Sequence, residues 1–176
     1  MLALMYRVAL RLMMIAVVLA GGAAPTAAAS INIVVLGASN TYGKGVARNA
    51  ALPAQLQGML RAKGYDVRVG NAGINGDTTA GMLRRLNAAV PAGTRLVILQ
   101  PGNNDVRRGV GGDRAGNIAA ISASLQARGV KVLLVERMLA GLRQHLQPDG
   151  EHLTAEGFRL AAARMLPQVE AAIGAR

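Results

Sequence analysis

The feature that most constrains the fold is an apolar run, Ile31 to Leu36, that leads directly into a short polar turn. The run has the length and composition of a buried β-strand, and Gly37-Ala38-Ser39-Asn40 follows it. This pattern places one serine, Ser39, on a tight turn at the carboxyl end of a strand. Ligands and catalytic groups of open α/β sheets gather at such strand ends. The turn after the first strand is therefore the first candidate for a functional site.

Predicted strands and helices alternate along the rest of the chain. The predicted strands cover residues 31–36, 65–69, 95–100 and 131–135, and the predicted helices cover residues 53–63, the stretch between Asp77 and Pro91, and residues 113–127 and 154–173. Apolar strands that alternate with helices are typical of a parallel sheet covered on both faces. The predicted fold class is therefore α/β, a three-layer α/β/α sandwich with a mainly parallel, flavodoxin-like sheet of four to five strands.

Residues 1–29 have the pattern of a secretory signal peptide. Two arginines precede an apolar run from Leu12 to Ala20, and three alanines end the segment at Ala29. The run is short for a membrane span of roughly 20 residues, which argues against an uncleaved anchor. We therefore expect cleavage near Ala29, one domain over residues 30–176, and a periplasmic or secreted protein.

The composition excludes several functional classes. The chain has no cysteine, which rules out disulfides, a thiolate nucleophile and cysteine-based metal sites. Its two histidines make a poor ligand set for metal-dependent hydrolysis, and neither a P-loop nor a dinucleotide-binding glycine pattern follows the first strand. We therefore expect no cofactor and no metal.

The charge of the chain bears on its partners. A net charge of +11 favours attraction to anionic surfaces such as phospholipid headgroups. Nucleic acid is not an expected partner, because the basic residues are scattered and the predicted mature chain keeps only Tyr42, Tyr65 and Phe158 for base stacking. Peripheral contact with an anionic membrane surface and a simple solvated basic surface both stay open. The protein is expected to be a monomer.

Only one serine is placed for catalysis. The others are Ser30, at the predicted cleavage site, and two serines within the predicted helix of residues 113–127. A serine hydroxyl needs a neighbouring base to become a good nucleophile, and histidine has the pKa for that task near neutrality. His152 has Asp149 three residues before it, so that a carboxylate can orient the imidazole, whereas His145 has no such neighbour.

Polar segments also follow two further strands. Asn71 to Asp77 follows the second predicted strand, and Gly102 to Asp105 follows the third. Parallel strands bring their carboxyl ends to one edge of a sheet, so these segments should lie close to the turn that carries Ser39. Each segment alone is explained by ordinary turn or capping chemistry. Their order along the chain favours a shared site.

Together these segments resemble the SGNH hydrolases, also called the GDSL esterase/lipase family, and within it the branch of thioesterase I, lysophospholipases and arylesterases. The resemblance covers nearly all of residues 31–173 and implies the SGNH hydrolase fold. It also implies that Ser39 is the nucleophile, that His152 is the general base and then the general acid, and that Asp149 orients the imidazole.

The same resemblance implies an oxyanion hole. Its donors would be the backbone N–H groups of Ser39 and Gly76 and the side-chain amide of Asn104. This assignment is chemically reasonable, because acyl transfer passes through a tetrahedral intermediate whose oxygen becomes negative, and preorganised donors stabilise that charge. Glycine at residue 76 allows the backbone to approach a substrate closely.

Two features depart from the family pattern. Ala38 replaces the aspartate that usually precedes the nucleophile, and Asn40 follows the nucleophile. The segment of residues 136–148 is also short, because the thioesterase branch usually has another helix and strand there. We expect this short segment to leave the sheet edge and the acyl pocket less covered, and to affect how the histidine loop reaches the nucleophile.

The resemblance implies an exported serine esterase or thioesterase that acts on small acyl esters, thioesters or lysophospholipids through an acyl-serine intermediate. Candidate residues for an acyl site are Met82, Leu83, Met138 and Leu139, although methionine and leucine at these spacings are more often core residues. Two alternatives stay open. One is a catalytically weak or inactive SGNH-fold binding protein for acylated or anionic envelope ligands, and the other is a carbohydrate O-deacetylase.

Overall fold

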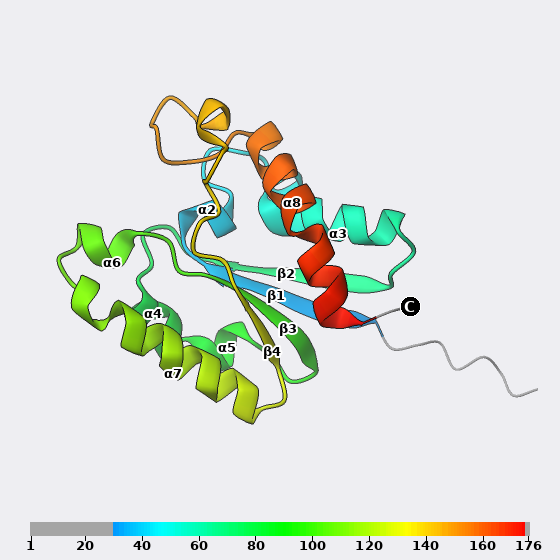
Figure 1. Ribbon diagram of the computed structural model, residues 1–176, viewed down its shortest axis with the longest axis horizontal. Helices are drawn as coiled ribbons and strands as arrows, with labels where there is room; N and C mark the ends of the chain where they lie inside the picture. Colours follow the sequence, from blue (N-terminus) through cyan, green and yellow to red (C-terminus); the bar gives the residue numbers. More distant parts are fainter. Residues whose placement is uncertain (1–29, 175–176) are drawn as a thin grey trace, which may run out of the picture.

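The computed structural model describes residues 30–174 and contains a four-stranded parallel sheet. The strands are β1 (Ile31–Gly37), β2 (Val67–Gly73), β3 (Thr94–Gln100) and β4 (Lys131–Leu134), in the spatial order β2-β1-β3-β4 (Figure 1). Neighbouring strands are parallel throughout. The predicted α/β fold, with a mainly parallel sheet of four to five strands, is confirmed, and the sheet has four strands in the described residues. The predicted signal peptide, residues 1–29, lies outside the described residues.

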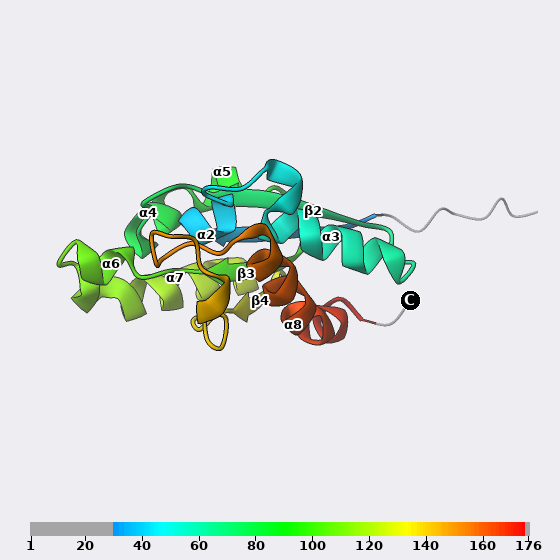
Figure 2. The ribbon, with the colours of Figure 1, turned by 90° about the horizontal axis from the view of Figure 1, so that it is seen from above.

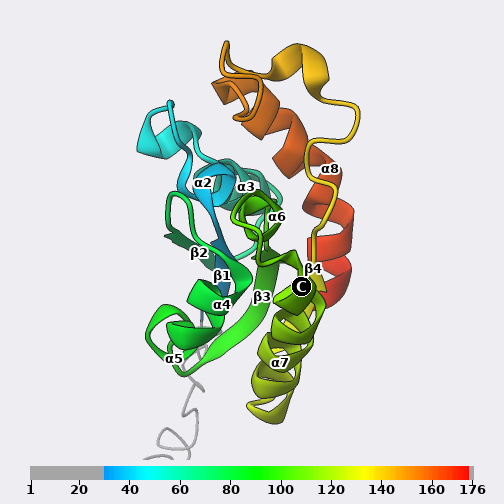
Figure 3. The ribbon, with the colours of Figure 1, turned by 90° about the vertical axis from the view of Figure 1, so that its left-hand side faces the viewer.

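Helices cover both faces of the sheet and make it a three-layer sandwich (Figure 3). The helices α3 (Leu52–Ala62) and α8 (Ala155–Ile173) lie on one face, and α4 (Thr79–Arg84), α5 (Leu86–Ala89) and α7 (Arg114–Ala127) lie on the other. Short elements occupy the connections: α2 (Ser39–Tyr42), α6 (Asn104–Arg107), and the 3-10 turns η1 (Arg48–Ala50), η2 (Gly111–Asp113) and η3 (Arg143–His145).

The sheet separates two apolar cores. Ile33 and Val35 of β1 pack toward α3 and α8, whereas Val34 and Leu36 pack toward the opposite helix layer. Because both faces of β1 are buried, its sequence is a continuous apolar run and does not alternate between apolar and polar residues. Full burial of a side chain such as Leu36 contributes about 1.5–3 kcal/mol.

The predicted helix starts are borne out at two caps. The Thr78 hydroxyl accepts a hydrogen bond from the N–H of Gly81 at the start of α4, and Thr154 accepts one from the N–H of Gly157 at the start of α8. Each cap satisfies one of the N–H groups that the first helical turn leaves without a partner.

Two local predictions were wrong. The second strand continues to Gly73 instead of ending at Val69, because residues 71–73 pair with the last residues of β1. The helix predicted before Pro91 is two helices, α4 and α5, with Arg85 at their junction. The break brings the Arg85 guanidinium against the backbone carbonyls of neighbouring strands, a long-range contact that helical periodicity does not show.

The connection between β4 and α8 passes beside α2 at the carboxyl end of the sheet (Figure 2). Within residues 30–174, β4 is an edge strand paired only with β3, and Leu134 is 41% exposed. The expectation of a less covered sheet edge agrees with this arrangement. In the same described range, no helix is both long and apolar enough to cross a membrane.

Candidate active site

The turn that carries Ser39 is held by close contacts that require glycine. A Cβ atom at Gly37 would lie 2.2 Å from Thr41 Oγ1 and 2.6 Å from the carbonyl oxygen of Gln100. The chain can therefore turn from β1 directly into α2 only without a side chain at this position. Ser39 becomes the first residue of α2 and is 8% exposed. The Thr41 hydroxyl then donates to Gln100 Oε1, which ties α2 to the end of β3.

Ser39, His152 and Asp149 form a continuous chain of hydrogen bonds. The distance from Ser39 Oγ to His152 Nε2 is 2.8 Å, and His152 Nδ1 lies 2.6 Å from Asp149 Oδ2. His152 is 3% exposed, so its imidazole is shielded from water. The three residues predicted from sequence are thus brought together, although 113 positions separate the serine from the histidine.

Asp149 is held as a carboxylate. Its Oδ1 accepts hydrogen bonds from the backbone N–H groups of Glu151 and His152, each at 3.0 Å. The Glu151 N–H bond, followed by the hydrogen bond to the His152 ring, keeps the pKa of the Asp149 carboxyl far below its usual range. An ionised Asp149 directs the Nδ1 proton of His152 toward itself and leaves Nε2 free to accept the Ser39 hydroxyl proton.

Asn40 holds the loop that carries His152 against the turn that carries Ser39. Its Nδ2 donates to the carbonyl oxygen of Glu151 at 3.1 Å, and its Oδ1 accepts from the N–H of Leu153 at 3.3 Å. The two bonded residues, Glu151 and Leu153, lie immediately before and after His152 in the sequence. From the sequence, Asn40 was recognised only as a departure from the family pattern, and its position directly after Ser39 was the one available signal of this role.

Gln147 provides a second tie within the short connection. Its Nε2 donates to the carbonyl oxygens of Lys44 and Leu153. The segment of residues 136–148 is therefore long enough to bring the histidine loop to Ser39.

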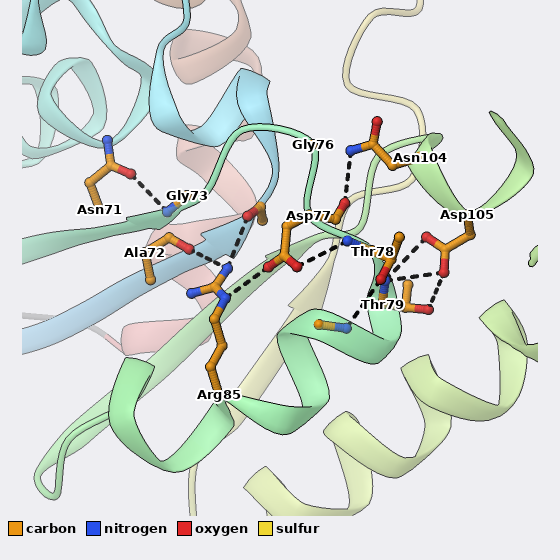
Figure 4. A network of polar contacts seen from close by, with 12 residues as sticks. Asn71, Ala72, Gly73, Gly76, Asp77, Thr78, Thr79, Arg85, Asn104 and Asp105 are labelled. Atoms are coloured by element: carbon orange, nitrogen blue, oxygen red, sulfur yellow. Dashed lines mark hydrogen bonds and ion pairs between the residues drawn. The ribbon is translucent and has the colours of Figure 1, made fainter. Parts of the chain in front are cut away.

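Asn104, one of the predicted oxyanion residues, lies beside Ser39 and His152. Asn104, the first residue of α6, is 5% exposed, and its Nδ2 donates to the carbonyl oxygen of Asp77 at 2.7 Å (Figure 4). Arg107 Nη2 donates to Asn104 Oδ1 at 2.6 Å, so both ends of the amide are oriented. One amide N–H bond goes to Asp77, which leaves the second available to an oxyanion.

Gly76 has a backbone conformation that favours glycine, with φ at +74°. The guanidinium of Arg108 donates to its carbonyl oxygen at 2.7 Å. Ser39 and Asn104 line the cavity in front of His152, whereas Gly76 is not among the lining residues.

A polar network anchors the loops around the oxyanion residues. Arg85 donates to Asp77 Oδ2 and to the carbonyl oxygens of Gly37 and Ala72, and so joins the ends of β1 and β2 (Figure 4). Asp105 is 1% exposed, and its carboxylate accepts bonds from the backbone N–H and the hydroxyl of Thr79. Arg85 was not predicted to take part in the site, because its partners, 8, 13 and 48 positions away, are brought to it only by the fold.

A cavity of about 460 Å³ opens in front of Ser39 and His152. This volume lies within the usual range for small-molecule sites. Met138 and Leu139 line it, as one reading of the sequence proposed. Met82 and Leu83 do not line the cavity, since they belong to α4 and pack into the core between α4 and the sheet. Sequence could not separate these two pairs because apolar periodicity looks the same in a core and in a pocket wall.

The remaining candidate side chains lie elsewhere. His145 belongs to η3 and does not line the cavity. Ser122 lies within α7 and donates to the carbonyl oxygen of Ile118. Across residues 30–174, the structure has no group of three or more histidine, aspartate or glutamate side chains able to hold a metal ion.

A parallel α/β/α sandwich with a serine and a histidine in contact at its carboxyl edge is the framework of a serine hydrolase. The chain belongs to the GDSL-like lipase/acylhydrolase family, whose model matches residues 35–171. The family membership predicted from the sequence is thereby confirmed.

Individual relatives agree with this assignment. The chain is 39% identical over 113 residues to Esterase TesA of Pseudomonas aeruginosa, and the match covers 61% of this chain and 55% of that protein. The chain thus spans about half the length of this curated relative.

Two solved structures share the fold. A crystal structure of TesA superposes with a TM-score of 0.72 at 27% identity, covering 80% of this chain and 99% of that one. AlinE4, an SGNH-hydrolase family esterase, gives a TM-score of 0.62 at 26% identity, covering 84% of this chain and 99% of that one.

Proposed function

We propose that this protein is a serine hydrolase that cleaves carboxylic ester or thioester bonds through an acyl-Ser39 intermediate. The observation that carries the proposal is the hydrogen bond of 2.8 Å between Ser39 Oγ and the buried Nε2 of His152. A nucleophile and a base in hydrogen-bond contact, with a third group that orients the base, are the requirements of acyl transfer.

The proposed reaction begins with attack of Ser39 Oγ on the carbonyl carbon, while His152 Nε2 takes the hydroxyl proton. Asp149 stabilises the imidazolium that forms. Collapse of the tetrahedral intermediate breaks the bond to the alcohol or thiol, which leaves with the proton from Nε2. Water then attacks the acyl-Ser39 ester with His152 as base, and the carboxylic acid and free Ser39 are released.

Stabilisation of the tetrahedral intermediate is assigned to the backbone N–H groups of Ser39 and Gly76 and to the amide of Asn104. The bonds that Asn104 makes to Asp77 and Arg107 support this role, because they fix the amide before the substrate arrives. Donors that need no reorganisation stabilise developing charge most effectively.

Export is part of the proposal and is supported by the sequence pattern of residues 1–29. A periplasmic or secreted location brings the enzyme to acyl esters, thioesters or lysophospholipids outside the cytoplasm. Peripheral contact with an anionic membrane surface is supported by the net charge of +11, which falls only to +9 when the two arginines of residues 1–29 are removed.

Labelling and turnover together test the proposal. Purified protein is assayed with p-nitrophenyl acetate, butyrate and octanoate, and is treated with a fluorophosphonate probe that labels active serines. Ser39→Ala should abolish labelling, and Ser39→Ala and His152→Ala should each reduce kcat by several orders of magnitude. Comparing the three wild-type rates also shows which acyl chain length the pocket accepts best.

Matched variants separate catalysis from folding. Ser124→Ala removes another serine, from α7, and His145→Gln replaces the second histidine. Both should keep labelling and kcat near the wild-type level. A folded wild-type protein that neither reacts with the probe nor hydrolyses the esters would refute the enzyme proposal and would favour a binding protein with the same fold.

A further inference from the structure

Three arginines from three different segments line the cavity in front of the proposed nucleophile. Arg107 belongs to α6, Arg114 begins α7, and Arg137 lies in the connection that follows β4. Two glutamates, Glu136 and Glu151, line the same cavity. Among the described residues, the cavity wall therefore carries three guanidinium groups and only two glutamate carboxylates.

Two of the three guanidinium groups have carboxylate partners. Arg107 forms an ion pair with Glu151, and Arg114 lies 2.9 Å from a carboxylate oxygen of Glu136. The hydrogen bond from Arg107 also lowers the pKa of the Glu151 carboxyl below its usual range, so that this glutamate stays ionised. Both glutamates are therefore already paired.

Arg137 is the one of these three arginines without a carboxylate partner in the described part of the chain. Among residues 30–174, no carboxylate or other hydrogen-bond acceptor contacts its exposed guanidinium. The next three residues, Met138, Leu139 and Ala140, line the cavity beside it. The Arg164 guanidinium donates to the carbonyl oxygen of Ala140 and so ties this wall to α8.

From these features we infer that the cavity selects esters that carry a carboxylate or phosphate group a few bonds from the scissile carbonyl, and that Arg137 binds this anion. The selectivity rests on the proposed function, because it concerns the substrate of the same site. The apolar residues beside Arg137 would contact the hydrocarbon part of such an ester. The net charge of +11, which is +9 without the two arginines of residues 1–29, also raises the local concentration of anionic substrates.

Two pairs of matched esters test the inference and distinguish the source of the anion. p-Nitrophenyl hemiglutarate carries a carboxylate on the acyl side, and its neutral match is p-nitrophenyl pentanoate. 1-Butyrylglycerol 3-phosphate carries a phosphate on the alcohol side, and its neutral match is 1-butyrylglycerol, with acid release followed by pH-stat. We expect kcat/KM to be about fivefold higher for an anionic ester than for its match, as for one partly exposed ion pair.

The preference should be electrostatic and should depend on one residue. It should shrink when the salt concentration rises from 0.1 M to 1 M, because the Debye length falls from about 10 Å to about 3 Å. Arg137→Gln should bring the two kcat/KM values of a pair together, and Arg137→Lys should retain part of the difference. Arg143→Gln is the control, since Arg143 is exposed on the same connection but does not line the cavity.

Two results would overturn the inference while leaving the proposed function intact. One is a wild type that hydrolyses the neutral esters at least as efficiently as both anionic ones. The other is an Arg137→Gln variant that keeps the full preference. If the wild type hydrolyses none of the four esters, the proposed function fails and the selectivity falls with it.

Discussion

Replacing Gly73 with alanine tests how closely β2 and α2 are packed. A Cβ atom at residue 73 would lie 2.1 Å from the backbone nitrogen of Tyr42 and 2.6 Å from its Cα. Ordinary van der Waals contact begins at 3.4 Å, so the two backbones must separate by about 1.3 Å, the difference between 3.4 and 2.1 Å. Both of these neighbouring atoms belong to the backbone, which means that α2 itself has to move.

This displacement acts directly on Ser39, the proposed nucleophile. Ser39 is the first residue of α2, and its Oγ lies 2.8 Å from His152 Nε2. A misplacement of about 1 Å at a reacting group lowers the rate on the order of 100-fold. We expect kcat for p-nitrophenyl butyrate to fall by about that factor in Gly73→Ala. Overpacking destabilises by about 1–3 kcal/mol, so Tm should fall by several degrees as well.

Gly70→Ala provides the matched control on the same strand. Its Cβ would lie 3.7 Å from both the Ile33 carbonyl oxygen and Val34 Cγ2, which is ordinary contact. Steady-state kinetics and thermal unfolding of the two variants should therefore differ, with Gly70→Ala close to the wild type in kcat. A Gly73→Ala protein with wild-type kcat and Tm would refute the reasoning, because it would mean that α2 is free to adjust without moving the nucleophile.

Three further predictions concern polar contacts around the site. Asn40→Ala removes the two bonds that bracket His152, and kcat should fall about tenfold in steady-state assays. Asp105→Ala leaves the buried N–H and hydroxyl of Thr79 without their acceptor, and urea denaturation should show a loss of about 3 kcal/mol. The pKa of Asp149 is lower in the folded state than in the unfolded state. The ionised carboxylate therefore stabilises the fold fully above the ordinary carboxyl pKa of about 3.9, and this stabilisation is lost as the pH falls below that value. The Tm difference between wild type and Asp149→Asn should therefore be constant from pH 7 to pH 5 and smaller at pH 3.

Each of these predictions has a control or a contrary result. Asn49→Ala, at an exposed site in η1, should leave kcat unchanged. Asp113→Ala, whose side chain makes no capping bond to α7, should change the free energy of unfolding by about 0.5 kcal/mol or less. A Tm difference for Asp149→Asn that widens as the pH falls would contradict the sign of the pKa argument.

The fold was predictable from sequence where local pattern and burial agree. The strands β1 and β3 are buried on both faces and appear as apolar runs. The caps at Thr78 and Thr154 depend on residues close in sequence, and both are formed. The prediction failed for β2, whose last residues are polar or small and become a strand only by pairing with β1.

The site was predictable to a similar extent. Elimination among a few serines and histidines selected Ser39 and His152, and these two side chains are in contact. Asn40 was not recognised, because its importance depends on bonds to residues more than 110 positions away. Arg137 was not recognised, because only the fold places it on the wall of the cavity that Ser39 and His152 also line. The catalytic and oxyanion roles themselves stay predictions until the variants are assayed.

The sequence by itself determined which chemistry was available: one serine at a strand end, one histidine with a nearby carboxylate, no thiol, and an alternation of strands and helices that requires a parallel sheet. The tertiary structure decided the distances between these groups. Register between parallel strands places Gly37, Gly73 and Gln100 at the same level, and this alignment brings the three polar segments together. Such placement depends on pairing between residues far apart in the chain, as between Gly37 and Gln100.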